Sequence, residues 1–305
     1  MQHHNILGRW ILVTPIPMFA TDEFAKLMGL KIVQVHPRLS GGTPATTSPR
    51  IAGTLKDRIF SSPGVGTFGG IFNLDTDDFN QGISSVIGEL KSVHSVEELL
   101  ILLPSDHLSD LYPETLKEIL AKFGGVVEFQ DLNHVIEMAD WSRTLLSRGN
   151  QKKLRQCNEN NFEFRMITDG ELSDLYEVLC LNREGIGATI SMTLGQIEDS
   201  FKNFPEKYFS FGVFSSKQLI AGAICVETAP RNLYVYMWGD DVNFRRFSPI
   251  TFLCSSLIDF GSSRNFQYLD LGTSSIDGKI LEGVARYKEN LGANGFDKSY
   301  IRLVL

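Results

Sequence analysis

The sequence predicts a mixed α/β fold, with a mixed sheet, divided between two domains. Strand-like and helix-like segments alternate along the chain. Three consecutive strand-like segments in the second half are joined by connections short enough for antiparallel hairpins. The length of 305 residues suggests two domains, although one large α/β domain would also fit, and a hydrophobic content of 43% is typical of a globular protein. A formal net charge of −7 argues against a general nucleic-acid-binding protein.

The first half combines irregular and regular segments. The apolar run over residues 10–19 contains Pro15 and Pro17, which favours an edge strand leading into a turn over an export signal. Residues 36–70 are rich in Pro, Gly, Ser and Thr, which is typical of a long loop that is functional or mobile. The regular elements expected after it are a helix over 77–93, a strand over 99–103, a helix over 114–123 closed by Gly124 and Gly125, and a strand over 126–135.

A basic segment separates the two halves. It contains no acidic residue, and its basic side chains are Arg143, Arg148, Lys152, Lys153 and Arg155. We therefore expect a first domain over 1–142, a basic connecting helix over 143–160 and a second domain over 161–305. The basic side chains either face solvent or contact a tRNA backbone or a phosphorylated substrate. No aromatic residue is interleaved with them, so the segment gives no support for base stacking.

The second half has clearer periodicity. Its expected elements are a strand over 162–167, helices over 169–182 and 193–203, strands over 208–214, 219–227 and 232–238, a helix from Pro249 to about residue 260, a strand over 267–271, a helix over 281–291 and a strand over 296–305. The strand over 232–238 is apolar on both faces, which predicts a central position in the sheet. Ser248 and Pro249 form a helix-start signal, and Gly261 is the expected terminator.

Several short motifs add a family resemblance to this order of elements. They lie at residues 62–70, 148–155, 182–184, 238–240, 248–249, 270–274 and 286–292. Together they resemble the FemAB-like branch of the GNAT acyltransferase superfamily over residues 50–295. The resemblance implies two tandem GNAT-like domains, the N-terminal one degenerate, and a sheet that opens beside its central strands to admit an acyl donor. Members of the branch with known activity transfer aminoacyl groups from charged tRNA to cell-wall precursors.

Two phosphate-binding patterns are present in altered form. Gly64–Gly69 fits the dinucleotide pattern G-x-G-x-x-G, but a proline precedes it and a strand-like segment follows it, so we interpret the glycines as turn residues. The resemblance places this loop, with Gly66 and Phe68, at the interdomain cleft. In the GNAT pyrophosphate motif, Ser248 and Ile250 replace the two glycines, which argues against coenzyme A bound in the usual manner. Arg245 retains its position and either binds an anionic group or pairs with a neighbouring aspartate.

The resemblance identifies Lys288 as the candidate catalytic lysine, since an ammonium group there would stabilise the oxyanion of an acyl-transfer intermediate. The alternative interpretation is an ordinary helix lysine. Tyr287 would shape the pocket or donate a proton to the leaving group. Asp240 follows the central strand and is either a general base or a turn-capping residue.

The remaining candidates are polar, aromatic or flexible residues at the ends of the predicted elements. Arg183 either clamps an anionic group or interacts with the helix dipole. Asp270 ends a strand and could cap the loop over 272–278. The residues expected to bind substrate are Gly66, Phe68, Asn182, Arg183, Trp238, Arg245, Ser248, Asp270 and Ser274.

We therefore expect an acyltransferase that moves an acyl or aminoacyl group onto an amine in the interdomain cleft. The donor is acyl-CoA or aminoacyl-tRNA, and no tightly bound cofactor or metal is expected. The alternative is a non-catalytic binding module for a small anionic ligand or a protein partner. The absence of an export signal and of a bilayer-length apolar stretch leads us to expect a soluble, cytoplasmic protein.

Overall fold

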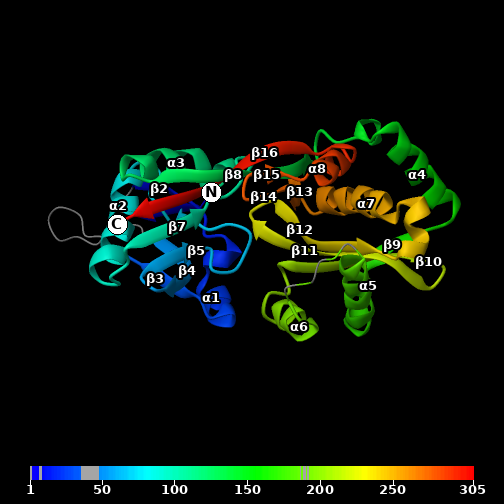
Figure 1. Cartoon of the computed structure of the whole chain (residues 1–305), viewed down its shortest axis with the longest axis horizontal. Coiled ribbons are helices and arrows are strands. Elements are labelled where there is room, and N and C mark those ends of the chain that lie inside the picture. Colours follow the sequence, from blue (N-terminus) through cyan, green and yellow to red (C-terminus); the bar gives the residue numbers. More distant parts are fainter. Residues whose placement is uncertain (1, 7–8, 36–47, 186, 188–189, 191) are drawn as a thin grey trace.

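The structure is a computed structural model that describes residues 2–6, 9–35, 48–185, 187, 190 and 192–305. Two lobes lie side by side along the long axis of the molecule (Figure 1). Within the described residues, twelve strands form one sheet that runs through both lobes in the order β3-β4-β5-β7-β16-β8-β13-β12-β11-β10-β9, with β6 paired to β4. The prediction of a mixed α/β fold is confirmed.

The first lobe is formed mainly by the N-terminal half of the chain and combines several short strands with helices and one long strand. Its elements are α1 (Asp22–Met28), β3 (Lys31–Gln34), β4 (Arg50–Lys56), β5 (Ile59–Ser62), β6 (Ile71–Phe72), α2 (Phe79–Ser92), β7 (Glu98–Leu102), α3 (Pro113–Lys122) and β8 (Val126–Glu137). A separate hairpin of β1 (Gln2–Ile6) and β2 (Arg9–Val13) precedes them. Part of the predicted 36–70 loop, residues 36–47, lies outside the described residues.

The prediction of a continuous loop over 36–70 is wrong, because β4 and β5 form a hairpin within it. The two turn residues, Asp57 and Arg58, have φ angles of 49° and 66°. A two-residue hairpin turn of this kind usually carries glycine or asparagine. The sequence therefore lacks the signal by which the hairpin could have been recognised.

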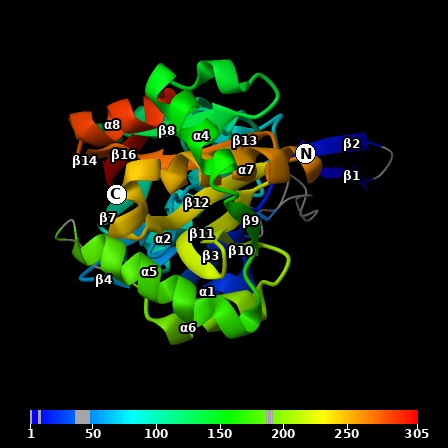
Figure 2. The ribbon, with the colours of Figure 1, turned by 90° about the vertical axis from the view of Figure 1, so that its right-hand side faces the viewer.

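The second lobe follows the predicted order of elements. It comprises α4 (Arg148–Glu159), β9 (Glu163–Met166), α5 (Leu172–Glu184), α6 (Leu194–Asn203), β10 (Tyr208–Ser215), β11 (Gln218–Ala229), β12 (Asn232–Asp240), α7 (Pro249–Ser263), β13 (Tyr268–Thr273) and α8 (Glu282–Glu289). Strand β12 lies between β11 and β13, which confirms its predicted central position. Helices α5 and α7 both contact β11 and β12, and Figure 2 shows them on opposite faces of these strands.

Helix α7 begins as predicted, with Ser248 as N-cap and Pro249 as its first residue, whereas its predicted end is wrong. The helix continues through Gly261 to Ser263, and a Cβ at Gly261 would lie 2.6 Å from the sulfur of Met138. The glycine therefore permits close packing and does not end the helix. Ser248 occupies the N-cap position in a left-handed conformation, and its side chain makes no capping hydrogen bond.

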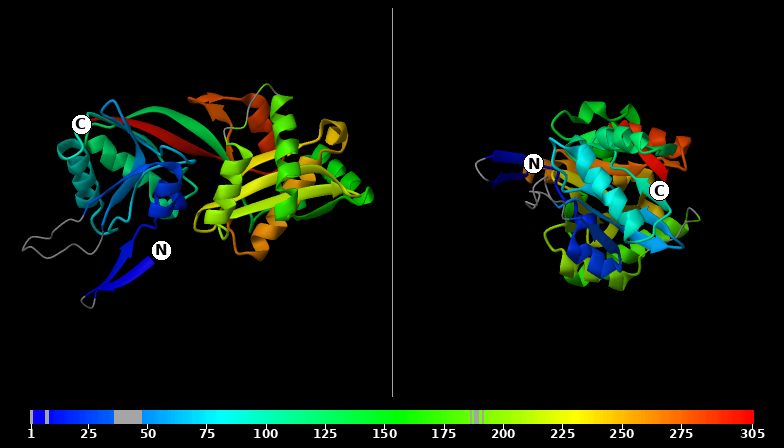
Figure 3. Two further views of the ribbon diagram at one scale, coloured as in Figure 1. Left: turned by 90° about the horizontal axis from the view of Figure 1, so that it is seen from below. Right: turned by 90° about the vertical axis from the view of Figure 1, so that its left-hand side faces the viewer.

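The last strand, β16 (Asn294–Val304), lies between β7 and β8 in the first lobe. Strand β8 pairs with β16 on one side and with β13 on the other. These two long strands run from one lobe to the other, as the left panel of Figure 3 shows. The C-terminal strand β16 is thus part of the sheet formed by the N-terminal half of the chain. The domain boundaries at residues 142 and 161 stay predictions.

One hydrophobic core contains residues from both lobes. Phe19 and Phe24 of the first lobe belong to the same buried cluster as Leu175, Tyr208 and Met237 of the second. The members from the first lobe are far in sequence from those of the second lobe. The cluster therefore forms only when the two lobes pack together. Burial of apolar area of this kind stabilises the packing by about 25 cal/mol per Å².

No helix among the described residues is long and apolar enough to cross a membrane. The part of the chain that the structure describes contains no group of three or more His, Cys, Asp and Glu side chains arranged to hold a metal ion. All four cysteines are free thiols, at positions 157, 180, 225 and 254.

Candidate functional site

The sheet opens between β12 and β13. These parallel strands are paired only from Asn232 and Tyr268 to Tyr234 and Asp270. Beyond this point β12 continues to Asp240 and β13 to Thr273, but the two strands no longer pair with each other. The two strands therefore leave a wedge between their carboxyl ends, next to the interface between the lobes.

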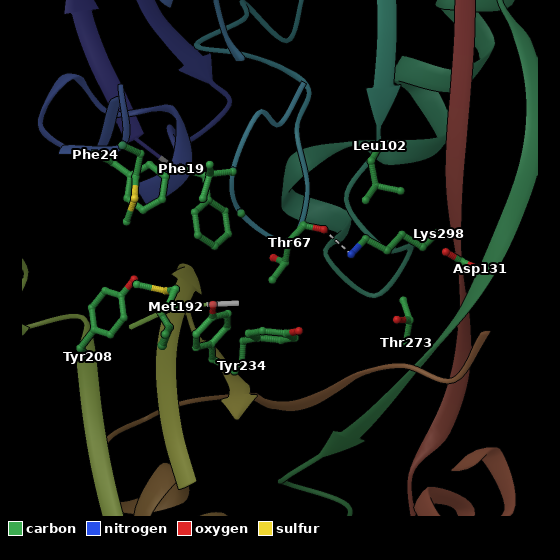
Figure 4. A pocket seen from close by; sticks show the side chains of 15 residues that line it. Phe19, Phe24, Thr67, Leu102, Asp131, Met192, Tyr208, Tyr234, Thr273 and Lys298 are labelled. Carbon is green, nitrogen blue, oxygen red and sulfur yellow. Dashed lines mark hydrogen bonds between the residues drawn. The ribbon is translucent and has the colours of Figure 1, made fainter. Parts of the chain in front are cut away.

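A cavity of about 370 Å³ lies where the wedge meets the first lobe. Its lining comes from both lobes: Phe19, Phe24, Met28, Val65, Gly66, Thr67, Leu102, Asp131, Met192, Tyr208, Val226, Tyr234, Tyr236, Thr273 and Lys298. In Figure 4, Phe19, Phe24, Met192 and Tyr208 lie toward one end, whereas Asp131, Thr273 and Lys298 lie toward the other. The cavity thus has an apolar end and a polar end.

Lys298 of β16 provides a buried cation at the polar end. Its side chain is buried, and its Nζ donates a hydrogen bond to the carbonyl of Thr67. Burial lowers the pKa of Lys298, while the carboxylates of Asp270 and Asp131 oppose that effect. Asp131 is the residue directly opposite Lys298 on β8.

Lys288 of α8 lies behind Thr273 in the cavity wall. Its Nζ donates to the carbonyl oxygens of Gly272 and Thr273, both at 2.8 Å. The side chain is buried, and this burial lowers its pKa to about 8. Asp270 opposes the shift, whereas Arg183 adds to it. The predicted catalytic lysine is therefore a buried, hydrogen-bonded amine that fixes the end of β13.

Asp270 connects the polar groups around the wedge. Its Oδ1 accepts hydrogen bonds from Asn133 Nδ2 and from the Gly272 amide, both at 2.9 Å, so it caps the following loop as predicted. Its Oδ2 lies 3.8 Å from Nε2 of His107, whose pKa is lowered mainly by burial. Burial lowers the pKa of His107, Lys288 and Lys298, and the Asp270 carboxylate opposes that shift in all three.

Asp240 belongs to a different group of polar residues. Its Oδ1 accepts from Asn182 Nδ2 at 2.7 Å and from Arg245 Nε at 3.1 Å. Burial raises the pKa of Asp240, while both partners oppose this shift. Asp240 and Arg245 line a separate depression of about 400 Å³ with Val178 and Leu181. Neither residue lines the cavity between the lobes.

An aromatic pair lies near the start of α7. The ring centroids of Trp238 and Tyr287 are 6.3 Å apart in an edge-on arrangement. Burial raises the pKa of Tyr287, and the hydroxyls of Ser248 and Thr251 act in the opposite direction. Tyr287 is therefore neutral at physiological pH and retains a hydroxyl proton.

The other predicted residues have diverse surroundings. Gly66 lines the cavity with a φ of 121°, and a Cβ there would lie 2.7 Å from the Phe19 ring. Phe68 is buried and its ring centroid is 5.6 Å from that of Phe19. Ser274 is fully buried, with its Oγ 2.8 Å from Nδ1 of His134. Arg183 is half-buried, and Gly185 to Met192 lies partly outside the described residues.

Sequence reasoning missed Lys298, Asp131 and Tyr234. Lys298 lies in a strand whose partners are far away in the sequence, so neither periodicity nor a motif predicts its burial. Tyr234 was recognised as a strand residue only. Its position at the point where β12 and β13 separate depends on the pairing register.

No family model matches the sequence, and no curated protein is significantly similar to it in sequence. Solved structures are similar in fold. FemX aligns with a TM-score of 0.69 at 11% identity, covering 94% of this chain and 92% of FemX. L-PGS from Bacillus licheniformis aligns with a TM-score of 0.58 at 10% identity, over 93% of this chain and 86% of L-PGS. A tandem GNAT protein from the clavulanic acid biosynthesis pathway gives 0.53 at 8% identity, over 90% and 83%. These similarities show the fold, and they confirm the predicted resemblance to FemAB-like, tandem GNAT structures.

Proposed function

We propose that the protein is an acyltransferase that forms an amide in the cavity between its lobes. The acceptor amine attacks the carbonyl carbon of an acyl or aminoacyl ester or thioester. A C–N bond forms, the bond from carbon to the leaving oxygen or sulfur breaks, and the amine proton ends on the leaving group. The fold shared with FemX and a tandem GNAT protein supports this reaction class.

The observation that carries the proposal is the position of Lys288. Its ammonium group is held by two carbonyl oxygens at the end of β13, where that strand separates from β12. The positive charge lies in a buried setting, where it interacts with a developing oxyanion more strongly than it would in water. Lys288 thus stabilises the tetrahedral intermediate through its charge, and its hydrogen bonds fix Thr273 in the cavity wall.

The first residues of α7 indicate which acyl donor the protein can bind. Pro249 is the first helical residue and has no amide N–H, and Ser248 carries a side chain in a left-handed conformation. This helix end offers fewer backbone donors to a pyrophosphate than a glycine-rich start does. We therefore keep aminoacyl-tRNA beside acyl-CoA as a donor class.

The test is a transfer assay with the purified full-length chain. Acyl-CoA thioesters and aminoacyl-tRNAs serve as donors, with a panel of amines as acceptors. We expect Lys288→Met to lower kcat/KM by about 100-fold or more, because it removes the charge and keeps an unbranched side chain. Lys217→Met, in the exposed β10–β11 turn, is the matched control and should retain full activity.

Two outcomes would contradict the proposal. One is full activity of a folded Lys288→Met variant, which would remove the assigned role of the lysine. The other is ligand-induced thermal stabilisation without product for every donor and acceptor pair, which would favour the non-catalytic binding module. Circular dichroism of each variant verifies that the fold is retained.

A further inference from the structure

The polar end of the cavity contains two opposite charges that do not form an ion pair with each other. Lys298 and Asp131 are directly opposite on β16 and β8, an arrangement in which side chains of opposite charge normally meet. Among the described residues, however, no carboxylate lies within 4.0 Å of the Lys298 ammonium. The Lys298 ammonium instead donates a hydrogen bond to the carbonyl of Thr67.

Asp131 is held by other groups. Its Oδ1 accepts a hydrogen bond from Ser275 Oγ at 2.6 Å and from the Gly278 amide at 3.0 Å. These contacts hold the carboxylate in place and leave Oδ2 as an acceptor. Asp131 and Lys298 both line the cavity. The polar end of the cavity therefore presents a carboxylate acceptor and a separate cationic donor. In Figure 4 the Lys298 side chain extends toward Thr67, so its ammonium points away from Asp131.

The Lys298 ammonium has more donors than the protein satisfies. An ammonium group carries three N–H donors, and the carbonyl of Thr67 accepts from one of them. A ligand carboxylate would accept from the remaining donors, and its single negative charge is repelled less by the nearby carboxylates than a double charge would be. The neighbouring carboxylates of Asp131 and Asp270 make the site unfavourable for a dianionic phosphate, because like charges repel in a buried environment.

The apolar end of the cavity indicates which side chain the ligand carries. Phe19, Phe24, Met28, Met192 and Tyr208 form an apolar wall there. Thioether and aromatic side chains adapt to aromatic or branched aliphatic groups. The volume of about 370 Å³ is at the small end of the range for ligand sites.

We infer that the acceptor is an α-amino acid with a large apolar side chain, whose carboxylate binds Lys298 and whose amino group binds Asp131. This inference rests on the proposed function, because transfer requires the amine to be the nucleophile. Asp131 holds the amino group at the polar end, near Thr273 and the wedge. The apolar side chain of the ligand occupies the aromatic end of the cavity.

Calorimetric titration of the full-length chain, without any donor, tests the inference. The probes are L-phenylalanine, phenethylamine without the carboxylate, 3-phenylpropanoate without the amine, and L-aspartate without the apolar group. We expect L-phenylalanine to bind about 10-fold to 100-fold more tightly than each of the other three, as expected for hydrogen bonds to charged groups. Lys298→Met should reduce its affinity to that of phenethylamine and leave phenethylamine binding unchanged.

A second variant keeps the test decisive if Lys298→Met fails to fold. Asp131→Asn should weaken L-phenylalanine about 10-fold while leaving 3-phenylpropanoate unchanged. Lys217→Met in the exposed β10–β11 turn is the control for removal of a lysine. Equal affinity of wild-type protein for L-phenylalanine and phenethylamine, or no binding of L-phenylalanine, would overturn the inference. The titration contains no acyl donor, so it tests binding alone. If L-phenylalanine binds selectively but receives no acyl group in the transfer assay, the proposed function is contradicted and the inferred ligand site is not.

Discussion

At the scale of single residues, the buried lysines differ chemically from lysines on a protein surface. Lys288 has a pKa of about 8 because burial disfavours its charged form. The role proposed for Lys288 requires the ammonium, so the active form is present below that pKa and is lost as the pH rises through it. The carboxylate of Asp270 favours the ammonium form and extends it toward higher pH.

Asp270→Asn should therefore move the alkaline limb of the pH profile to lower pH. The wild-type value of kcat/KM should fall as the pH rises through about 8, and removal of the negative charge should lower the pKa of Lys288 further. Asp240→Asn is the matched control, because Asp240 is not among the groups that shift Lys288. A limb that stays in place in Asp270→Asn, or moves equally in both variants, would contradict the assignment.

The site residues that could be predicted from the sequence lie in short motifs or at the ends of predicted strands. Lys288 and Asp270 lie in such motifs, and the structure places both beside the cavity wall. Lys298 and Asp131 carry no such mark, since their meeting depends on β16 pairing with β8 over a separation in sequence of 167 residues. Local patterns contain no information about a pairing of that range.

At the scale of elements, sequence patterns were sufficient where periodicity and turn residues agree. The helices and hairpin strands of the second lobe were predicted to within a few residues for this reason. The β4–β5 hairpin was missed because Asp57 and Arg58 adopt positive φ angles without a glycine. The end of α7 was misplaced because Gly261 serves packing against Met138.

Helix α4 has a basic face that is exposed and an apolar face that is buried. Arg148, Lys152 and Arg155 are exposed at helical spacing, whereas Leu154 and Cys157 are buried. Replacing the three basic residues with alanine should change the free energy of unfolding by at most about 0.5 kcal/mol each. Leu154→Ala should cost about 2–5 kcal/mol, because it leaves a cavity. Urea denaturation followed by circular dichroism measures both changes.

The same triple variant distinguishes the donors. With aminoacyl-tRNA as donor, loss of phosphate contacts should weaken binding and reduce the dependence of binding on salt concentration. With acyl-CoA as the donor, KM should be unaffected by these exposed charges. A large loss of stability in the triple variant would show that the basic face is structural.

At the scale of the whole molecule, the two lobes share both a sheet and a core. Strand β16 joins the C-terminal end of the chain to β7 and β8. The cluster that includes Phe19 and Leu175 is buried only when the lobes are packed together. Because loss of either contact exposes apolar surface in both lobes, we expect them to unfold as one unit.

Ile301→Ala tests this cooperativity. Ile301 of β16 is 2% exposed and belongs to the first-lobe core, so the substitution should lower the free energy of unfolding by about 2–5 kcal/mol. Scanning calorimetry should show one endotherm that moves as a whole to lower temperature, with equal calorimetric and van't Hoff enthalpies. Val304→Ala on the same strand is the control, because Val304 is 72% exposed and its loss should change stability by less than about 0.5 kcal/mol. Two endotherms, with only one displaced by Ile301→Ala, would mean that the lobes unfold independently and that the shared strand does not couple them.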